Sequence, residues 1–153
     1  MEIEAIKKTL HKLEKLMYGY NFEVTFGIEV FVNCYSYEDF AIQLKTVYPE
    51  ATPNEISPVI ISKEELLKDL VECLEYRGDD GAGLILDELQ DKTLKDEQAK
   101  YLQFIEKFLS QSIHIYAYPN SKGIPGYPVW WDYRYLILSK DGKALFTHGS
   151  SSD

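Results

Sequence analysis

The last third of the chain alternates apolar and polar side chains with a period of two, which favours β-strands. The alternation predicts strands over residues 113–118, 130–138 and 144–148. Residues 139–142 read Ser-Lys-Asp-Gly, and an Asp-Gly pair between two strands is typical of a tight antiparallel hairpin. This third of the chain also holds eight of the 21 aromatic residues: Tyr116, Tyr118, Tyr127, Trp130, Trp131, Tyr133, Tyr135 and Phe146.

Two further strands are expected nearer the N-terminus. Residues 22–32 alternate over their whole length, which predicts a long strand with one buried face and one wetter face. Gly27 in its middle indicates a bulge, a bend or a break into two strands. Residues 59–61, Val-Ile-Ile, predict a short buried strand.

Four segments show the three- and four-residue spacing of amphipathic helices. Residues 84–86 fit either a helix or a strand. The first expected helix covers residues 2–18 and ends before Gly19, and the second is a short helix capped by Ser36, with Asp39 three residues later. The third begins at a capping box formed by Ser62 and Glu65 and runs to about Tyr76. The fourth covers about residues 94–110 and is opened by Thr93, with Asp96 three residues later.

Helix and strand patterns segregate along the chain instead of alternating, which favours the α+β class. We therefore predict an antiparallel β-sheet of about four to five strands, with the helices packed mainly on one of its faces. At 153 residues the chain fits a single globular domain, residues 1–153. A domain of this size buries enough surface to be stable without a disulfide or a metal.

The two cysteines, Cys34 and Cys73, lie 39 positions apart and have no metal-ligand spacing, so we expect free, buried thiols in a reducing compartment. The acidic start of the chain does not resemble a signal peptide, and no apolar run is long enough to cross a bilayer. We expect a cytoplasmic protein without a membrane partner. No motif calls for a cofactor, and none is expected.

The net charge of −9 is unevenly distributed. Residues 61–100 hold 6 basic and 12 acidic side chains, whereas residues 101–153 hold 5 basic and 4 acidic ones. An acidic protein repels phosphate backbones, so nucleic-acid binding is not expected. A basic protein partner would be attracted instead. Asp79 and Asp80, in the Gly-rich loop 78–83, belong to the acidic segment and are candidate binding residues. This loop lacks the alternating oxygen ligands of a calcium loop, so no metal is expected there.

The Trp-Trp pair at 130–131 divides the strand that follows into two faces. Trp131, Tyr133 and Tyr135 share one face with Ile137, and we expect helices to cover most of this aromatic row as core. Asp132 and Arg134 share the opposite face with Trp130, and we expect a hydrated pair that a partner protein can reach.

Two features flank this strand. The Pro/Gly-rich loop 119–128 is expected either to lie near a binding surface or to cover a pocket lined by Tyr118, Tyr127 and Trp130. The tail 149–153, Gly-Ser-Ser-Ser-Asp, is expected to be either disordered or an anionic cluster next to hydroxyl groups.

His114 and His148 support an alternative function. With Asp132 and Tyr133 they would form the acid–base or metal site of a small enzyme if the fold brought them together. The spacing does not demand it, and a histidine that faces water or bonds locally is the simpler reading for each. The alternative fails if the two rings lie more than ~10 Å apart. No catalytic residue is assigned.

The run W-W-D-Y-x-Y-L-I-L, the Asp-Gly hairpin and the ending H-G-S-S-S-D resemble the C-termini of small bacterial proteins of unknown function. The whole chain is similar in character to immunity proteins of bacterial polymorphic-toxin systems, which are small, acidic, α+β and free of catalytic motifs. The resemblance implies a non-enzymatic protein that binds and neutralises a basic toxin. It assigns no role to an individual residue.

Overall fold

A computed structural model describes residues 2–51, 57–78, 83–119 and 130–152. The elements follow the order α1 (Glu2–Leu16), β1 (Glu23–Phe31), α2 (Tyr37–Val47), β2 (Val59–Ile60), α3 (Lys63–Glu75), α4 (Glu88–Ser110), β3 (Ser112–Ala117), β4 (Trp131–Ser139) and β5 (Ala144–Ser152). The strands form one antiparallel sheet in the order β1-β5-β4-β3-β2. The predicted α+β class and the five-stranded antiparallel sheet are confirmed.

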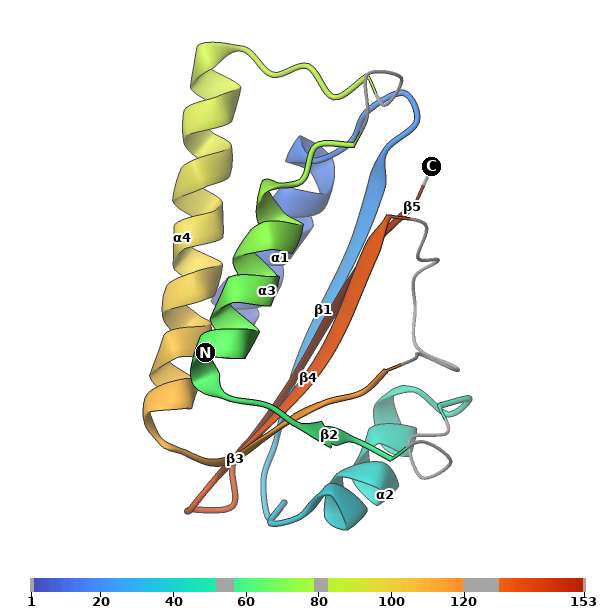
Figure 1. Ribbon diagram of the computed structural model, residues 1–153, viewed down its shortest axis with the longest axis vertical. Helices are drawn as coiled ribbons and strands as arrows, with labels where there is room; N and C mark the ends of the chain where they lie inside the picture. Colours follow the sequence, from blue (N-terminus) through green and yellow to red (C-terminus); the bar gives the residue numbers. More distant parts are fainter. Residues whose placement is uncertain (1, 52–56, 79–82, 120–129, 153) are drawn as a thin grey trace.

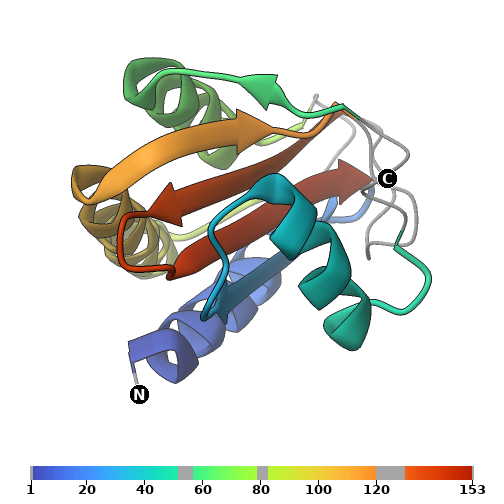
Figure 2. The ribbon, with the colours of Figure 1, turned by 90° about the horizontal axis from the view of Figure 1, so that it is seen from below.

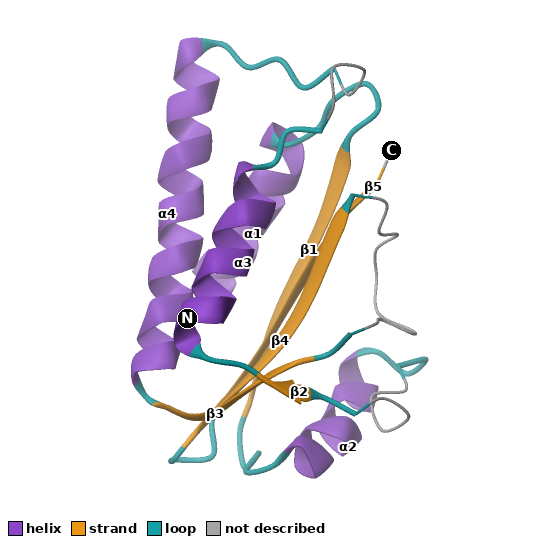
Figure 3. Ribbon diagram, in the orientation of Figure 1, coloured by secondary structure: helices purple, strands orange, loops and turns teal. Residues whose placement is uncertain are grey.

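Helices α1, α3 and α4 lie on one face of the sheet, and α2 lies on the other (Figures 1 and 3). The view from below shows the strands side by side, with α2 in front of the sheet (Figure 2). The main core lies under α1, α3 and α4 and includes Leu13, Phe22, Tyr101 and Tyr133. A smaller core lies under α2 and is built around Phe40, Leu44 and Phe146.

The C-terminal segment lies inside the sheet, which excludes a disordered tail or a free anionic cluster over residues 149–152. Strand β5 continues to Ser152 and pairs with β1 on one side and β4 on the other. Ser151 is fully buried. Gly149 leaves room for the ring of Tyr133, because a Cβ there would lie 2.6 Å from Cε2 of that ring. Backbone hydrogen bonds to β1 and β4 hold this polar segment in the sheet, although its amino-acid composition does not indicate a strand.

The helix caps are partly as expected. The side chain of Ser36 accepts a hydrogen bond from the Asp39 N–H, and Ser62 and Glu65 form the predicted capping box. The predicted start of the last helix at Thr93 is wrong: α4 begins at Glu88 behind a capping box of Asp87 and Gln90. Asp87 stands before a full extra turn of helix, so it is the true N-terminal cap.

Three other local predictions are resolved. Residues 84–86 belong to neither a helix nor a strand. The strand expected at residues 22–32 forms over Glu23–Phe31 and is continuous through Gly27. The short strand at 59–61 exists, but it is not buried, because β2 is the outermost strand and its Val59 and Ile60 are exposed by 55% and 72%.

Both cysteines are free and buried, as expected. Burial raises the pKa of Cys34 to about 11 and that of Cys73 to about 12, so neither is a reactive thiolate near neutral pH. Across the described part of the chain, none of the helices combines the length and the apolar character that a bilayer crossing requires.

Candidate functional site

Arg134 is buried, which contradicts the expected hydrated pair. Its side chain is 4% exposed, while that of Asp132 is 34% exposed. Arg134 donates from Nη1 to Oδ2 of Asp132 at 2.8 Å and from Nε to the carbonyl oxygen of Tyr118 at 2.9 Å. The hydrogen bonds to a carboxylate and a carbonyl offset the free-energy cost of burying the guanidinium charge. This arrangement holds the end of β3 against β4 and leaves only Asp132 within reach of a partner.

His148 is the cross-strand neighbour of Arg134 and is buried on the α2 face of the sheet. Its Nε2 lies 3.1 Å from the hydroxyl of Tyr48, the residue that directly follows α2. Burial, and then the positive charge of Arg134, lower the pKa of His148 to about 4. The imidazole is therefore neutral at pH 7 and ties α2 to the sheet.

His114 lies far from His148. It pairs with Leu138 in β4, whereas His148 pairs with Arg134, so the two histidines are two strands apart and four residues apart along the sheet. Strand spacings place their Cα atoms roughly 16 Å from each other. The fold therefore does not assemble the site that the enzyme alternative requires.

The residues expected around the 119–128 loop are separated. Tyr118 is buried against Phe40 of the small core, with ring centroids 5.6 Å apart. Trp130 instead stacks on Phe22 at 5.2 Å and belongs to the edge of the main core. It is half-buried and is not the exposed aromatic anchor expected of a binding residue. Tyr127, Asp79 and Asp80 lie outside the described residues.

The aromatic row of β4 is core, as predicted. Trp131, Tyr133 and Tyr135 stack in sequence, with ring centroids 6.0 and 5.2 Å apart. The Tyr133 hydroxyl lies 2.8 Å from that of Tyr101, which also bonds the Thr147 hydroxyl. Thr147 in turn donates to the Gly27 carbonyl at 3.0 Å. These hydrogen bonds link α4, β4, β5 and β1 through the protein interior.

An acidic groove runs between α3 and the β3–β4 side of the sheet. Its volume is about 340 Å³, and Ile61, Glu65, Lys68, Asp69, Glu72, Ala117 and Tyr135 line it. Glu65, Asp69 and Glu72 are spaced by four and three residues, so they follow one side of the helix. The Tyr135 hydroxyl donates to Asp69 and fixes that carboxylate at the groove. All three carboxylates are exposed, so this groove is the best candidate for recognition of a cation.

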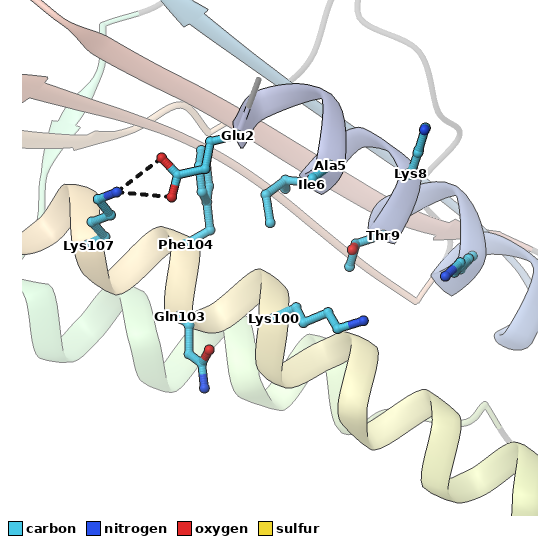
Figure 4. A pocket seen from close by; sticks show the side chains of 10 residues that line it. Glu2, Ala5, Ile6, Lys8, Thr9, Lys100, Gln103, Phe104 and Lys107 are labelled. Carbon is cyan, nitrogen blue, oxygen red and sulfur yellow. Dashed lines mark hydrogen bonds and ion pairs between the residues drawn. The ribbon is translucent and has the colours of Figure 1, made fainter.

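Another groove lies between α1 and α4 and is lined by four lysines (Figure 4). Its volume is about 570 Å³. Lys107 pairs with Glu2 at 3.0 Å, and Lys12 and Lys100 pair with the buried Glu97 at 3.6 and 3.0 Å. Lys12, Lys100 and Lys107 therefore already pair with carboxylates of the protein itself, and Lys8 is the fourth lysine of the groove. The groove has the character of a contact between two helices.

Comparison with known proteins identifies a fold. No protein-family model matches the sequence, and no curated protein matches it. The structure is similar to citrus MAF1 in two crystal forms. In space group P 31 2 1 the TM-score is 0.54 at 11% identity, over 95% of this chain and 97% of citrus MAF1. In space group C 2 2 21 the TM-score is 0.57 at 9% identity, over 94% and 98%. At this identity, the likeness concerns the fold alone.

Proposed function

We propose that this protein is a non-enzymatic binding protein that recognises a basic protein through the acidic groove of α3. The observation that carries the proposal is the row of exposed carboxylates formed by Glu65, Asp69 and Glu72. Lys68 is the one basic side chain among the described residues that line the groove. Aligned carboxylates attract cationic partners and orient them during encounter.

Exposed apolar side chains next to the groove supply a second contact. Val59 and Ile60 are exposed at the sheet edge, directly before Ile61 of the groove wall. Apolar area next to charge is the usual composition of a protein interface, in which burial gives affinity and charge gives orientation. The combination fits a folded protein partner better than a small cation.

The resemblance to immunity proteins supports a more specific version of the proposal, in which the basic partner is a toxin that this protein neutralises. A cytoplasmic location accords with it, because free buried thiols are typical of reducing compartments. Neutralisation needs only stable occlusion of the toxin, so it requires no catalytic group.

The test combines affinity capture with measured binding. The protein would first capture partners from a lysate of the cells that encode it. The dissociation constant of each captured protein would then be measured for the wild type and for the E65Q/E72Q double variant. We expect about tenfold weaker binding by the variant, since two interfacial charges are lost, and a steep loss of affinity with added salt.

The E64Q/E106Q variant is the matched control. It removes two charges from exposed helical positions that do not line the groove. Unchanged affinity of this control together with a weakened E65Q/E72Q variant would support the groove. Equal affinity of all three proteins, or a captured partner that is acidic, would refute the proposal.

A further inference from the structure

We propose that the open edge of β1 is a separate binding site, which takes an extended basic segment of another protein as an added β-strand. Strand β1 is nine residues long and ends the sheet on one side. Figure 2 shows it at the margin of the sheet, beside α1. A free sheet edge offers a row of backbone donors and acceptors that another chain can pair with.

The direction of the free groups follows from one hydrogen bond. The Phe26 N–H donates to Oε2 of Glu14 at 2.9 Å, so the backbone of Phe26 points away from β5. All nine residues of β1 pair with β5 without a shift in register. Backbone groups alternate in direction along such a ladder. The N–H and C=O groups of Val24, Ile28 and Val30 therefore also point away from β5. Among the described residues, no contact outside the sheet satisfies the N–H groups of Ile28 and Val30.

Glu14 acts at this edge as a carbonyl of a neighbouring strand would. Its carboxylate accepts the N–H that an added strand would otherwise bond. A groove of about 350 Å³ lies along residues 23–25, and another of about 240 Å³ lies along residues 26–29. Glu14 lines both grooves, so its displacement would join them along most of β1.

The opposite edge of the sheet is a poorer template. Strand β2 has only two residues, and Pro58 directly before it has no N–H to donate. Short strands and proline are common protections of a sheet edge against pairing. Within the described sheet, β1 is therefore the better edge for strand addition.

Charge defines the occupant. Glu23 and Glu29 project from the same face of β1, because they are an even number of residues apart. Cross-strand neighbours of opposite charge stabilise a pair of strands, so lysine or arginine is favoured opposite Glu23. Glu29 already pairs with Lys7 of α1 at 3.4 Å, so a cation opposite it would have to replace that lysine. Pairing of two β1 strands about Phe26 would place Glu23 opposite Glu29 twice, and this repulsion disfavours a second copy in that register. The partner is a basic segment of a different protein.

The probe is a synthetic peptide of about eight residues that alternates lysine with valine, which is a common strand length. It would be titrated into ¹⁵N-labelled E65Q/E72Q protein, so that competition from the α3 groove is weakened. We expect the amide signals of Ile28 and Val30 to shift, and their hydrogen exchange to slow by about tenfold at saturation. The same peptide N-methylated at every second residue keeps its charge but loses strand donors, and it should not bind.

Two variants at Glu14 separate pairing from charge. Both E14A and E14Q lose the carboxylate charge, but only E14A also loses the oxygen that accepts from Phe26. We expect the peptide to bind E14A about threefold more tightly than E14Q, because the competing acceptor is gone. Equal binding of the N-methylated peptide, equal affinity of the two variants, or an absence of shifts in β1 would each overturn the proposal. None of these outcomes bears on the α3 groove.

Discussion

The imidazole of His148 lies directly over the backbone of Gly27, in the space that a side chain at position 27 would fill. The two residues are adjacent in the β1–β5 ladder, although 121 positions separate them in the sequence. Gly27 is therefore required by contact with the histidine and does not mark a bulge or a break. The close approach also brings Nε2 of His148 to the hydroxyl of Tyr48.

Substitution of Gly27 by alanine should destabilise the protein by about 1–3 kcal/mol, because a methyl group forced into a packed site displaces its neighbours. Urea unfolding followed by tryptophan fluorescence would measure the change. In a His148→Ala background the same substitution should cost less than ~1 kcal/mol, since the ring is gone. A cost that is equal in both backgrounds would show that the histidine is not the obstacle.

Stability should fall between pH 6.5 and pH 4 because of His148. Its pKa is lowered to about 4 in the folded protein, whereas an unfolded histidine titrates near 6.5. Between these pH values His148 is protonated in the unfolded chain but neutral in the folded protein. The free energy of unfolding therefore decreases as the pH falls. The loss should reach on the order of 3 kcal/mol and level off below pH 4.

The contribution of His148 is separated from that of the carboxylates by comparing the wild type with His148→Gln. Urea titrations at several pH values should give a shallower pH dependence for the variant over this range. Parallel curves for the two proteins would mean that folding does not lower the pKa of His148.

Loss of the Tyr101 hydroxyl should destabilise the core although its shape is retained. Tyr101→Phe leaves the hydroxyls of Tyr133 and Thr147 without their shared partner. Buried unsatisfied polar groups cost about 1–3 kcal/mol, which thermal or urea unfolding would detect. Tyr18→Phe is the control, because Tyr18 is 66% exposed. Similar effects of the two substitutions would contradict a structural role for the hydroxyl network.

Local patterns were good guides to local structure. The spacing around Ser62 and Glu65 predicts the start of α3, because a capping box involves only neighbouring residues. The alternation in β4 predicts which rings are core, since adjacent side chains on a strand face opposite sides. Both predictions rest on interactions within a few residues of one another.

The errors arose where distant segments meet. The alternation assigns Arg134 to the face opposite the aromatic row, but it does not show that α2 and Tyr118 cover that face. The acidic groove was missed for the same reason: the charge of residues 61–100 is evident, but its position against Tyr135 is not. The three- and four-residue spacing of Glu65, Asp69 and Glu72 was the available signal.

The sequence alone determined the α+β class, most of the helices and strands, and the buried face of β4, because each follows from periodicity and capping within a segment. Only the tertiary structure decided that β5 lies inside the sheet between β1 and β4, that Arg134 and His148 are buried and that the two histidines are far apart. These features depend on strand order and on the packing of α2. Both are set by contacts between residues far apart in the chain, which a local pattern does not encode.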